Sequence, residues 1–200
     1  MDNVALFKQA LQNNDVSYVY RKYLLGHDVW YFREKLRLTD FAHRYDDFKI
    51  TMSQKLGVHI NNIAIVGSAK LGFSITPTEE KMFREFSETS DIDIVVVSSE
   101  LFRSSWAAFL DIQSKKYLKG YSAITSNIFR RFVSLKEVDA TNEFFRGWIG
   151  KMEPCQARLQ IVYSMPNEIN YRIYESWEDV ERYHIKGLAK LKEMIQDGVQ

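Results

Sequence analysis

The sequence is poor in cysteine and histidine and has no long apolar run, and each shortage excludes a class of protein. A single cysteine, Cys155, cannot form a disulfide within the chain, which excludes the small disulfide-stapled secreted scaffolds. One cysteine and four scattered histidines give none of the spacings typical of zinc sites. No apolar run reaches the ~20 residues that a membrane span needs, and no cationic and apolar leader opens the chain. We therefore expect a cytoplasmic protein without a membrane partner.

An excess of charge of either sign is also missing. The chain carries 27 Lys and Arg against 26 Asp and Glu, for a net charge of +1. This balance provides no overall attraction to nucleic acid or to an anionic membrane. With 46% apolar residues and only 9 glycines and 3 prolines, the 200 residues have a globular composition. We expect one domain, residues 1–200, made of a helical N-terminal segment (1–58) and a core (59–200) that ends in a C-terminal helix.

The N-terminal segment has the apolar spacing of helices. Residues 2–14 place apolar side chains on one face, with Asp2 as the expected N-cap. Residues 39–58 repeat apolar side chains every three or four positions, and Gly57 stands where that helix should end. Between them lies an aromatic-rich stretch in which Gly26 is expected to end or bend a helix.

The core begins with two apolar runs of strand type. "NIAIVGS" (62–68) and "DIDIVVVS" (91–98) predict strands, joined by a polar connection with one or two helical turns over 79–86. A helix capped by Ser99 should follow the second strand.

The rest of the chain predicts further helices and two more strands. We expect two short helices in 123–134 and 141–152, the second capped by Thr141, then strands "ARLQIVYS" (157–164) and "EINYRIYESW" (168–177) joined by a hairpin or tight corner, then an amphipathic helix over 178–198. The order of elements predicts an α/β or α+β fold with a small mixed sheet flanked by helices.

Two aspartates open the second predicted strand. Side chains alternate along a strand, so Asp91 and Asp93 point to one face while Ile92 and Ile94 point to the other. Adjacent carboxylates repel each other unless a cation compensates them. The pair is therefore a candidate ligand set for Mg²⁺ or Mn²⁺, which prefer oxygen ligands. The structural alternative is a loop exit with two solvated carboxylates.

A Gly-Ser pair ends the first predicted strand. Gly67 allows a sharp turn and a close approach of backbone to phosphate, and the Ser68 hydroxyl is a hydrogen-bond partner for phosphate oxygens. Lys70 could add a positive charge, and Ser90 is a further candidate phosphate contact. Each has an ordinary alternative: a turn for Gly67 and Ser68, a solvated lysine, and a cap or turn role for Ser90.

Together the segments "GSAKLG" (67–72) and "SDID" (90–93) resemble the signature of the DNA polymerase β-like nucleotidyltransferase superfamily, in a minimal or second-messenger-synthase-like form. The resemblance implies that Asp91 and Asp93 are catalytic and hold Mg²⁺, and that an NTP binds near Gly67 and Ser68. It implies transfer of NMP to a hydroxyl acceptor, on RNA, a protein or a nucleotide, with release of pyrophosphate. Relatives of this size also suggest an antiphage or toxin–antitoxin setting.

A third carboxylate, which active members carry on a later strand, is not found at its expected place. The middle of the predicted strand 157–164 is Gln160, which is neutral and cannot act as a general base. Glu168, Asp139 and Glu143 are weaker candidates for that role. A catalytically degenerate protein that senses nucleotides or regulates a partner is therefore the alternative to an enzyme, and a protein-interaction domain with a purely structural SDID is the third hypothesis.

Overall fold

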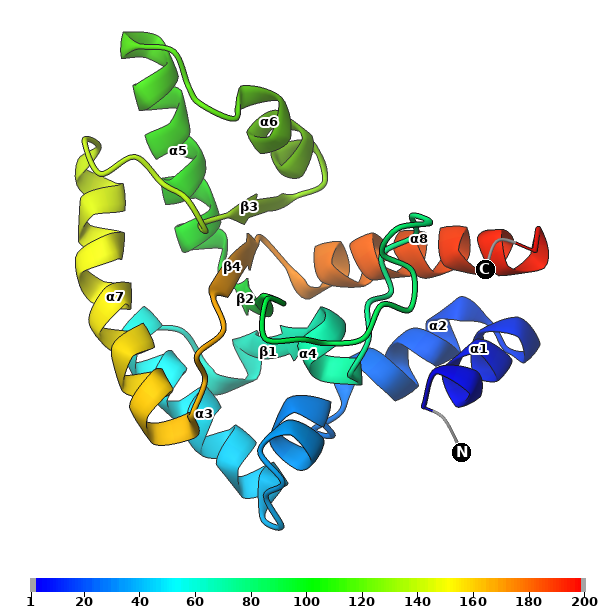
Figure 1. The fold of residues 1–200 in the computed structure, drawn as a ribbon. Coiled ribbons are helices and arrows are strands. Elements are labelled where there is room, and N and C mark those ends of the chain that lie inside the picture. The colour runs from blue at the N-terminus through cyan, green and yellow to red at the C-terminus, as the bar shows by residue number, and fades with distance from the viewer. Residues whose placement is uncertain (1–2, 199–200) are drawn as a thin grey trace.

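The computed structural model describes residues 3–198 and has at its centre a four-stranded mixed sheet (Figure 1). The strands are β1 (Ile63–Val66), β2 (Ile92–Val97), β3 (Phe132–Ser134) and β4 (Ile169–Tyr174), in the order β1-β2-β4-β3. β2 runs antiparallel to β1 and parallel to β4, and β3 runs antiparallel to β4. The predicted mixed α+β fold is confirmed.

Helices make up most of the remaining chain. They are α1 (Asn3–Asn13), α2 (Val16–Val19), α3 (Phe41–Leu56), α4 (Gly67–Leu71), α5 (Ser99–Lys115), α6 (Tyr121–Phe129), α7 (Glu143–Tyr163) and α8 (Trp177–Gln196), with the π-helical turns η1 (Tyr20–Leu25) and η2 (Tyr31–Lys35) and the 3₁₀ turn η3 (Ile60–Asn62). The predicted N-terminal helices are confirmed. Gly26 ends η1, and Gly57 ends α3 with φ of 71°, a conformation that glycine adopts without strain. Asp2 lies outside the described residues.

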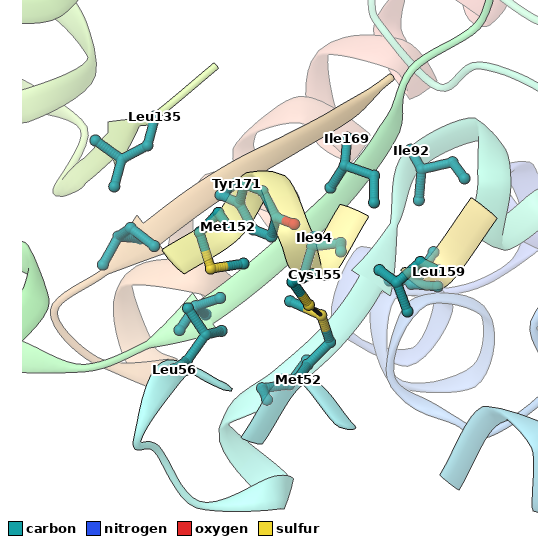
Figure 2. Close-up of a cluster of buried hydrophobic side chains, with 14 of the residues drawn as sticks. Met52, Leu56, Ile92, Ile94, Leu135, Met152, Cys155, Leu159, Ile169 and Tyr171 are labelled. Carbon is teal, nitrogen blue, oxygen red and sulfur yellow. Dashed lines mark hydrogen bonds between the residues drawn. The ribbon is translucent and has the colours of Figure 1, made fainter. Parts of the chain in front are cut away.

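Alternation along the strands divides the buried side chains between the two faces of the sheet. Ile92, Ile94 and Val96 of β2 face a core built with α3, α5 and α7, part of which Figure 2 shows. Val95 and Val97 face the opposite side, which α8 covers. In Figure 1, α8 leaves the sheet on the side away from α7. The face that α8 covers is also the face to which Asp93 belongs.

The N-terminal helices form a second apolar cluster with the C-terminal half of α8. Phe7 and Leu11 of α1 pack there with Leu188 and Leu191 of α8. The long connection between α4 and β2 also joins this cluster through buried side chains, including Phe73. This connection contains hydrogen-bonded turns and one isolated antiparallel bridge between Phe73 and Glu85. The helical turns expected over 79–86 are not formed.

The prediction of a strand over 157–164 is wrong, because this segment is the last part of α7. The side chains of Met152, Cys155, Leu159 and Tyr163 are buried at intervals of three and four residues, the period of a helix. The β-branched pair Ile161 and Val162 that suggested a strand lies on the exposed face, 84% and 52% accessible. No hairpin therefore joins 157–164 to β4.

Two helix caps differ by one residue from those expected. The side chain of Ser98, not Ser99, accepts a hydrogen bond from the backbone N–H of Leu101 and caps α5. Asn142, not Thr141, caps α7. The short strand β3 inside the segment 123–134 was not predicted. Within residues 3–198, no helix has both the length and the apolar character that crossing a membrane requires.

Candidate functional site

The Gly-Ser turn and the two aspartates meet at one end of the sheet. β1 and β2 are paired so that Val66 lies opposite Asp93, which brings the next residue, Gly67, against the Asp93 side chain. A Cβ atom on Gly67 would lie 3.1 Å from Asp93 Oδ2, and its φ of 67° is in the left-handed region. Both the left-handed backbone and the close carboxylate oxygen therefore favour glycine at this position. The half-buried Ser68 follows in the first turn of α4.

Asp93 is held by side chains from the neighbouring strand β4. Asn170, its partner in the sheet register, donates from Nδ2 to Asp93 Oδ1 at 2.7 Å. Arg172 lies two residues further along the same face of β4 and donates to both carboxylate oxygens, from Nε to Oδ1 at 3.1 Å and from Nη2 to Oδ2 at 3.0 Å. Ser134 of β3 donates to Asn170 Oδ1 at 2.8 Å, which fixes the amide with its N–H groups toward Asp93.

Arg172 is in turn enclosed by aromatic rings. Its guanidinium carbon lies 5.9 Å from the ring centroids of Phe132 and Tyr183, and Nη1 donates to the Tyr183 hydroxyl at 3.3 Å. Burial by itself lowers the pKa of Arg172, but the Asp93 carboxylate offsets this and holds that pKa above its ordinary value. The bidentate pair, with side chains only 22% and 20% exposed, is a fixed part of the fold.

Asp91 is compensated by a different cation, Lys136, from the loop after β3. Lys136 Nζ lies 3.2 and 3.1 Å from the two Asp91 oxygens and 3.1 Å from Glu168 Oε2. Partial burial opposes the charge of Lys136, but its bonds to Glu168 and Asp91 raise the pKa of the ammonium above its ordinary value. Lys136 therefore bridges two carboxylates at the edge of the sheet.

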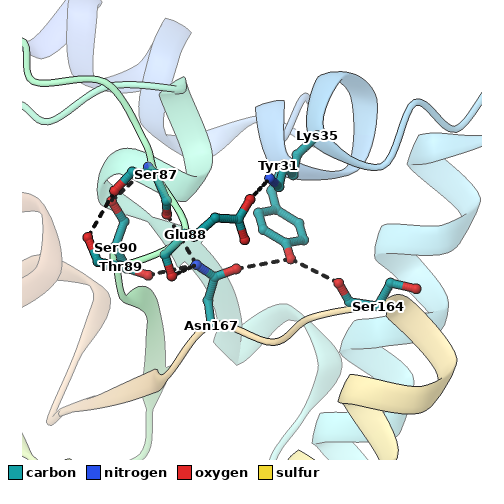
Figure 3. Close-up of polar contacts among 8 residues, drawn as sticks. All are labelled: Tyr31, Lys35, Ser87, Glu88, Thr89, Ser90, Ser164 and Asn167. Carbon is teal, nitrogen blue, oxygen red and sulfur yellow. Dashed lines mark hydrogen bonds and ion pairs between the residues drawn. The ribbon is translucent and has the colours of Figure 1, made fainter.

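A buried asparagine fixes the turns that carry Asp91 and Glu168 (Figure 3). Asn167 is 2% exposed, and its Nδ2 donates to the carbonyl oxygens of Ser87, Glu88 and Ser90 at 3.3, 3.2 and 2.9 Å. Its Oδ1 accepts from the Tyr31 hydroxyl at 3.3 Å. The segment before β2 is thereby tied to the segment before β4 and to the N-terminal region.

Two of the predicted phosphate contacts have structural partners instead. Lys70 is 3% exposed and donates from Nζ to the carbonyl of Gly26, and burial lowers its pKa to about 8. Ser90 accepts from the backbone N–H of Ser87 at 3.0 Å through Oγ, which is the turn role considered as its alternative. The structure therefore brings Gly67 against Asp93. Asp91 instead pairs with Lys136, and the Lys70 ammonium is directed to the N-terminal segment.

Gln160 does not occupy the position of a third carboxylate. It lies on the exposed face of α7, and the residue beside Asp93 on the neighbouring strand is Asn170. Of the weaker candidates, Glu168 is joined to Asp91 through Lys136, whereas Asp139 pairs with Lys116 at 2.6 Å and Glu143 begins α7. A neutral amide therefore stands where the resemblance implies an acid.

The donor set does not fit Mg²⁺ in this arrangement. Among residues 3–198, no three or more Asp, Glu, His or Cys side chains are grouped so as to hold a metal ion. Both aspartates already have a cation within hydrogen-bond distance, Lys136 and Arg172. Two unit charges about 4 Å apart interact by about 4 kcal/mol at an effective dielectric constant of 20, so a divalent ion beside Arg172 would meet roughly twice that repulsion.

A cavity of about 870 Å³ adjoins this cluster on the side of Lys136 and Glu168. Its walls come from α5, α6, α7, the loop after β3 and the start of β4. Aromatic side chains lie along the inner wall, among them Phe109, Trp148 and Tyr171. Its volume is within the range of small-molecule sites.

Sequence reasoning missed Lys136, Asn170 and Arg172. The two β4 residues carry a signal, because the strand period of two in 169–174 places them on one face, opposite Tyr171 and Ile173. Lys136 lies in an irregular loop and has no such signal. Comparison with family models, curated protein sequences and solved structures found no match for this chain. The functional interpretation therefore depends on the site itself.

Proposed function

We propose that this chain is a catalytically degenerate nucleotidyltransferase-like domain that acts by binding, as a nucleotide sensor or as the regulatory partner of another protein. One observation carries the proposal: Asp93 is hydrogen-bonded to Arg172 and Asn170. Metal-dependent transfer needs a metal ion in the place of the Arg172 guanidinium and a third carboxylate in the place of the Asn170 amide. Mg²⁺ lowers the barrier to displacement at an α-phosphate by coordinating the reacting oxygens directly, and a guanidinium cannot do this. The Arg172 side chain instead stabilises the fold around Asp93.

The Mg²⁺-dependent nucleotidyltransferase is the second candidate, and one observation favours it. Gly67 lies against the Asp93 carboxylate, which is the juxtaposition that the GS and DxD segments require for metal-dependent transfer. This candidate requires Lys136 and Arg172 to leave the two aspartates when Mg-NTP binds. Lys136 is 31% exposed and can rotate into solvent, whereas Arg172 is enclosed by Phe132 and Tyr183.

Calorimetric titration with each NTP, with and without Mg²⁺, followed by a pyrophosphate-release assay separates the candidates. The binding domain is expected to bind an NTP with no pyrophosphate release, and to lose this binding in the Asp91→Asn/Asp93→Asn variant. Pyrophosphate release by the wild type would overturn the proposal in favour of the enzyme. If the folded wild type binds no NTP, the nucleotide sensor and the enzyme both fail, and a domain that acts through a protein partner remains.

The double variant loses two ion pairs, so it needs a control for folding. Asp111→Asn also removes the charge of a carboxylate paired with a lysine, Lys115 at 2.7 Å, on α5, and it keeps an amide oxygen that can accept the hydrogen bond from Asn142. Circular dichroism and the urea midpoint of both variants establish that any loss of binding comes from the site.

A further inference from the structure

The cavity beside Lys136 has a wall that is poorly anchored. Ala123, Ile124 and Asn127 of α6 line it. Although α6 is rich in apolar side chains, it contains no fully buried residue, and only Ile124 and Ile128 pack partly against the main core. Gly120 caps the start of α6 with φ of 76°, and Arg131, the residue after its C-cap, has φ of 65°, so a left-handed residue lies at or just beyond each end. Few buried contacts between two turns are typical of an element that opens at low cost in free energy.

The opposite wall is rigid and largely apolar. Phe109 of α5 and Trp148 and Met152 of α7 are at most 7% exposed and belong to the main core. The Trp148 ring makes an edge-on contact with Tyr171 of β4, with centroids 5.4 Å apart. A flat ligand between α6 and this wall would meet aromatic and aliphatic carbon on both sides.

The charged side chains at the rim are already compensated. Lys116 pairs with Asp139 at 2.6 Å, Lys136 pairs with Asp91 and Glu168, and Lys119 lies 3.8 Å from Glu137. The cavity also has the carboxylate of Glu153 in its lining. Its three lysines therefore face at least as many carboxylates, and no excess of positive charge is available for a phosphate or sulfonate.

We propose that the cavity under α6 binds an uncharged, planar, largely apolar small molecule between the helix and the wall of Phe109 and Trp148. Binding removes the apolar surface of the ligand from water, which is favourable. A negative charge on the ligand would be desolvated without gaining an unpaired cation at the rim, so the site discriminates against it. This cavity lies beside the nucleotide site of the proposed function and shares Lys136 and Glu168 with its edge, but the proposal does not depend on whether the chain binds an NTP.

The test uses two probes that share one ring system and differ in charge: N-phenylnaphthylamine, which is neutral, and anilinonaphthalene sulfonate, which is anionic. Probe fluorescence is expected to show saturable binding of the neutral probe with one site per chain, at least about tenfold tighter than the anionic probe. Equal or tighter binding of the sulfonate, or no binding of the neutral probe by the folded protein, would overturn the proposal.

Variants on α6 locate the site. Because α6 has no buried side chain, these substitutions are not expected to disturb folding. Ala123→Trp and Asn127→Trp each place a ring in the cavity and are expected to weaken the neutral probe about tenfold or more. Leu110→Trp, on the exposed face of α5 and outside the cavity, should leave binding unchanged. Unchanged binding in both α6 variants refutes the location. Displacement of the probe by ATP refutes the choice of an uncharged ligand, and does so independently of whether pyrophosphate is released.

Discussion

Replacing Arg172 by methionine is expected to destabilise the protein and to expose the metal-binding capacity of Asp93. Methionine keeps much of the apolar stem that packs against Phe132 and Tyr183 but removes both hydrogen bonds to the carboxylate. Breaking a fully buried ion pair costs ~3–5 kcal/mol, whereas an exposed pair contributes ~0–1 kcal/mol. The Asp93 and Arg172 side chains are 20% and 22% exposed. We therefore expect the free energy of unfolding to fall by roughly 2–3 kcal/mol.

Urea unfolding measures this loss, and a double-mutant cycle assigns it to the pair. Arg172→Met, Asp93→Asn and the double variant should show a coupling energy of about 1–3 kcal/mol, with unchanged m-values. Arg158→Met, on the exposed face of α7, is the matched control and should shift stability by less than about 0.5 kcal/mol. Additive effects of the two site variants would show that the contact between them contributes nothing.

A second variant, which adds one change to Arg172→Met, tests why the wild-type site does not suit a divalent ion. Arg172→Met combined with Asn170→Asp places a second carboxylate in register with Asp93 and removes the nearest cation. This variant should bind Mn²⁺ more tightly than the wild type in a calorimetric titration. If wild type and variant bind Mn²⁺ equally, the guanidinium is not what excludes the metal, and Arg172 does not make the site degenerate.

Three further predictions concern Lys70, the two glycines with positive φ, and the C-terminal part of α7. Burial lowers the pKa of Lys70 to about 8 from 10.5, so between those pH values the unfolded chain holds a proton that the native state has lost. The free energy of unfolding should therefore rise by at most ~3 kcal/mol as the pH increases over this window. Lys70→Met should abolish this rise in urea titrations. Gly67→Ala should lower the free energy of unfolding by ~1 kcal/mol or more beyond the effect of Gly57→Ala, as measured by urea unfolding. Both glycines have positive φ, but only at Gly67 would a Cβ lie 3.1 Å from a carboxylate oxygen. Equal costs would contradict this close approach. Leu159→Ala should cost ~2–5 kcal/mol and Gln160→Ala less than about 0.5 kcal/mol in thermal or urea unfolding, whereas the reverse order would favour a strand over 157–164.

The fold was predictable where one physical signal dominated. α3 and α8 were found because apolar side chains recur at helical spacing, and the end of α3 because Gly57 adopts a left-handed conformation there. β1 and β2 were found because each is a short apolar run bounded by turn residues. β3 has only three residues, and it is a strand because it pairs with β4. Its sequence alone therefore does not distinguish it from the end of a helix.

The site was only partly predictable, and the reason is the misassigned segment 157–164. There, β-branched Ile161 and Val162 favour a strand locally, but burial of Leu159 and Tyr163 against the core stabilises a helix instead. Once that segment is helical, β4 becomes the parallel neighbour of β2, and Asn170 and Arg172 must lie on the face of Asp93. A carboxylate on this partly covered strand face is costly unless it is paired, and Asn170 and Arg172 of the neighbouring strand supply the donors. Arg172 thus compensates the charge of Asp93 within the sheet, and the two residues are best understood as one structural unit.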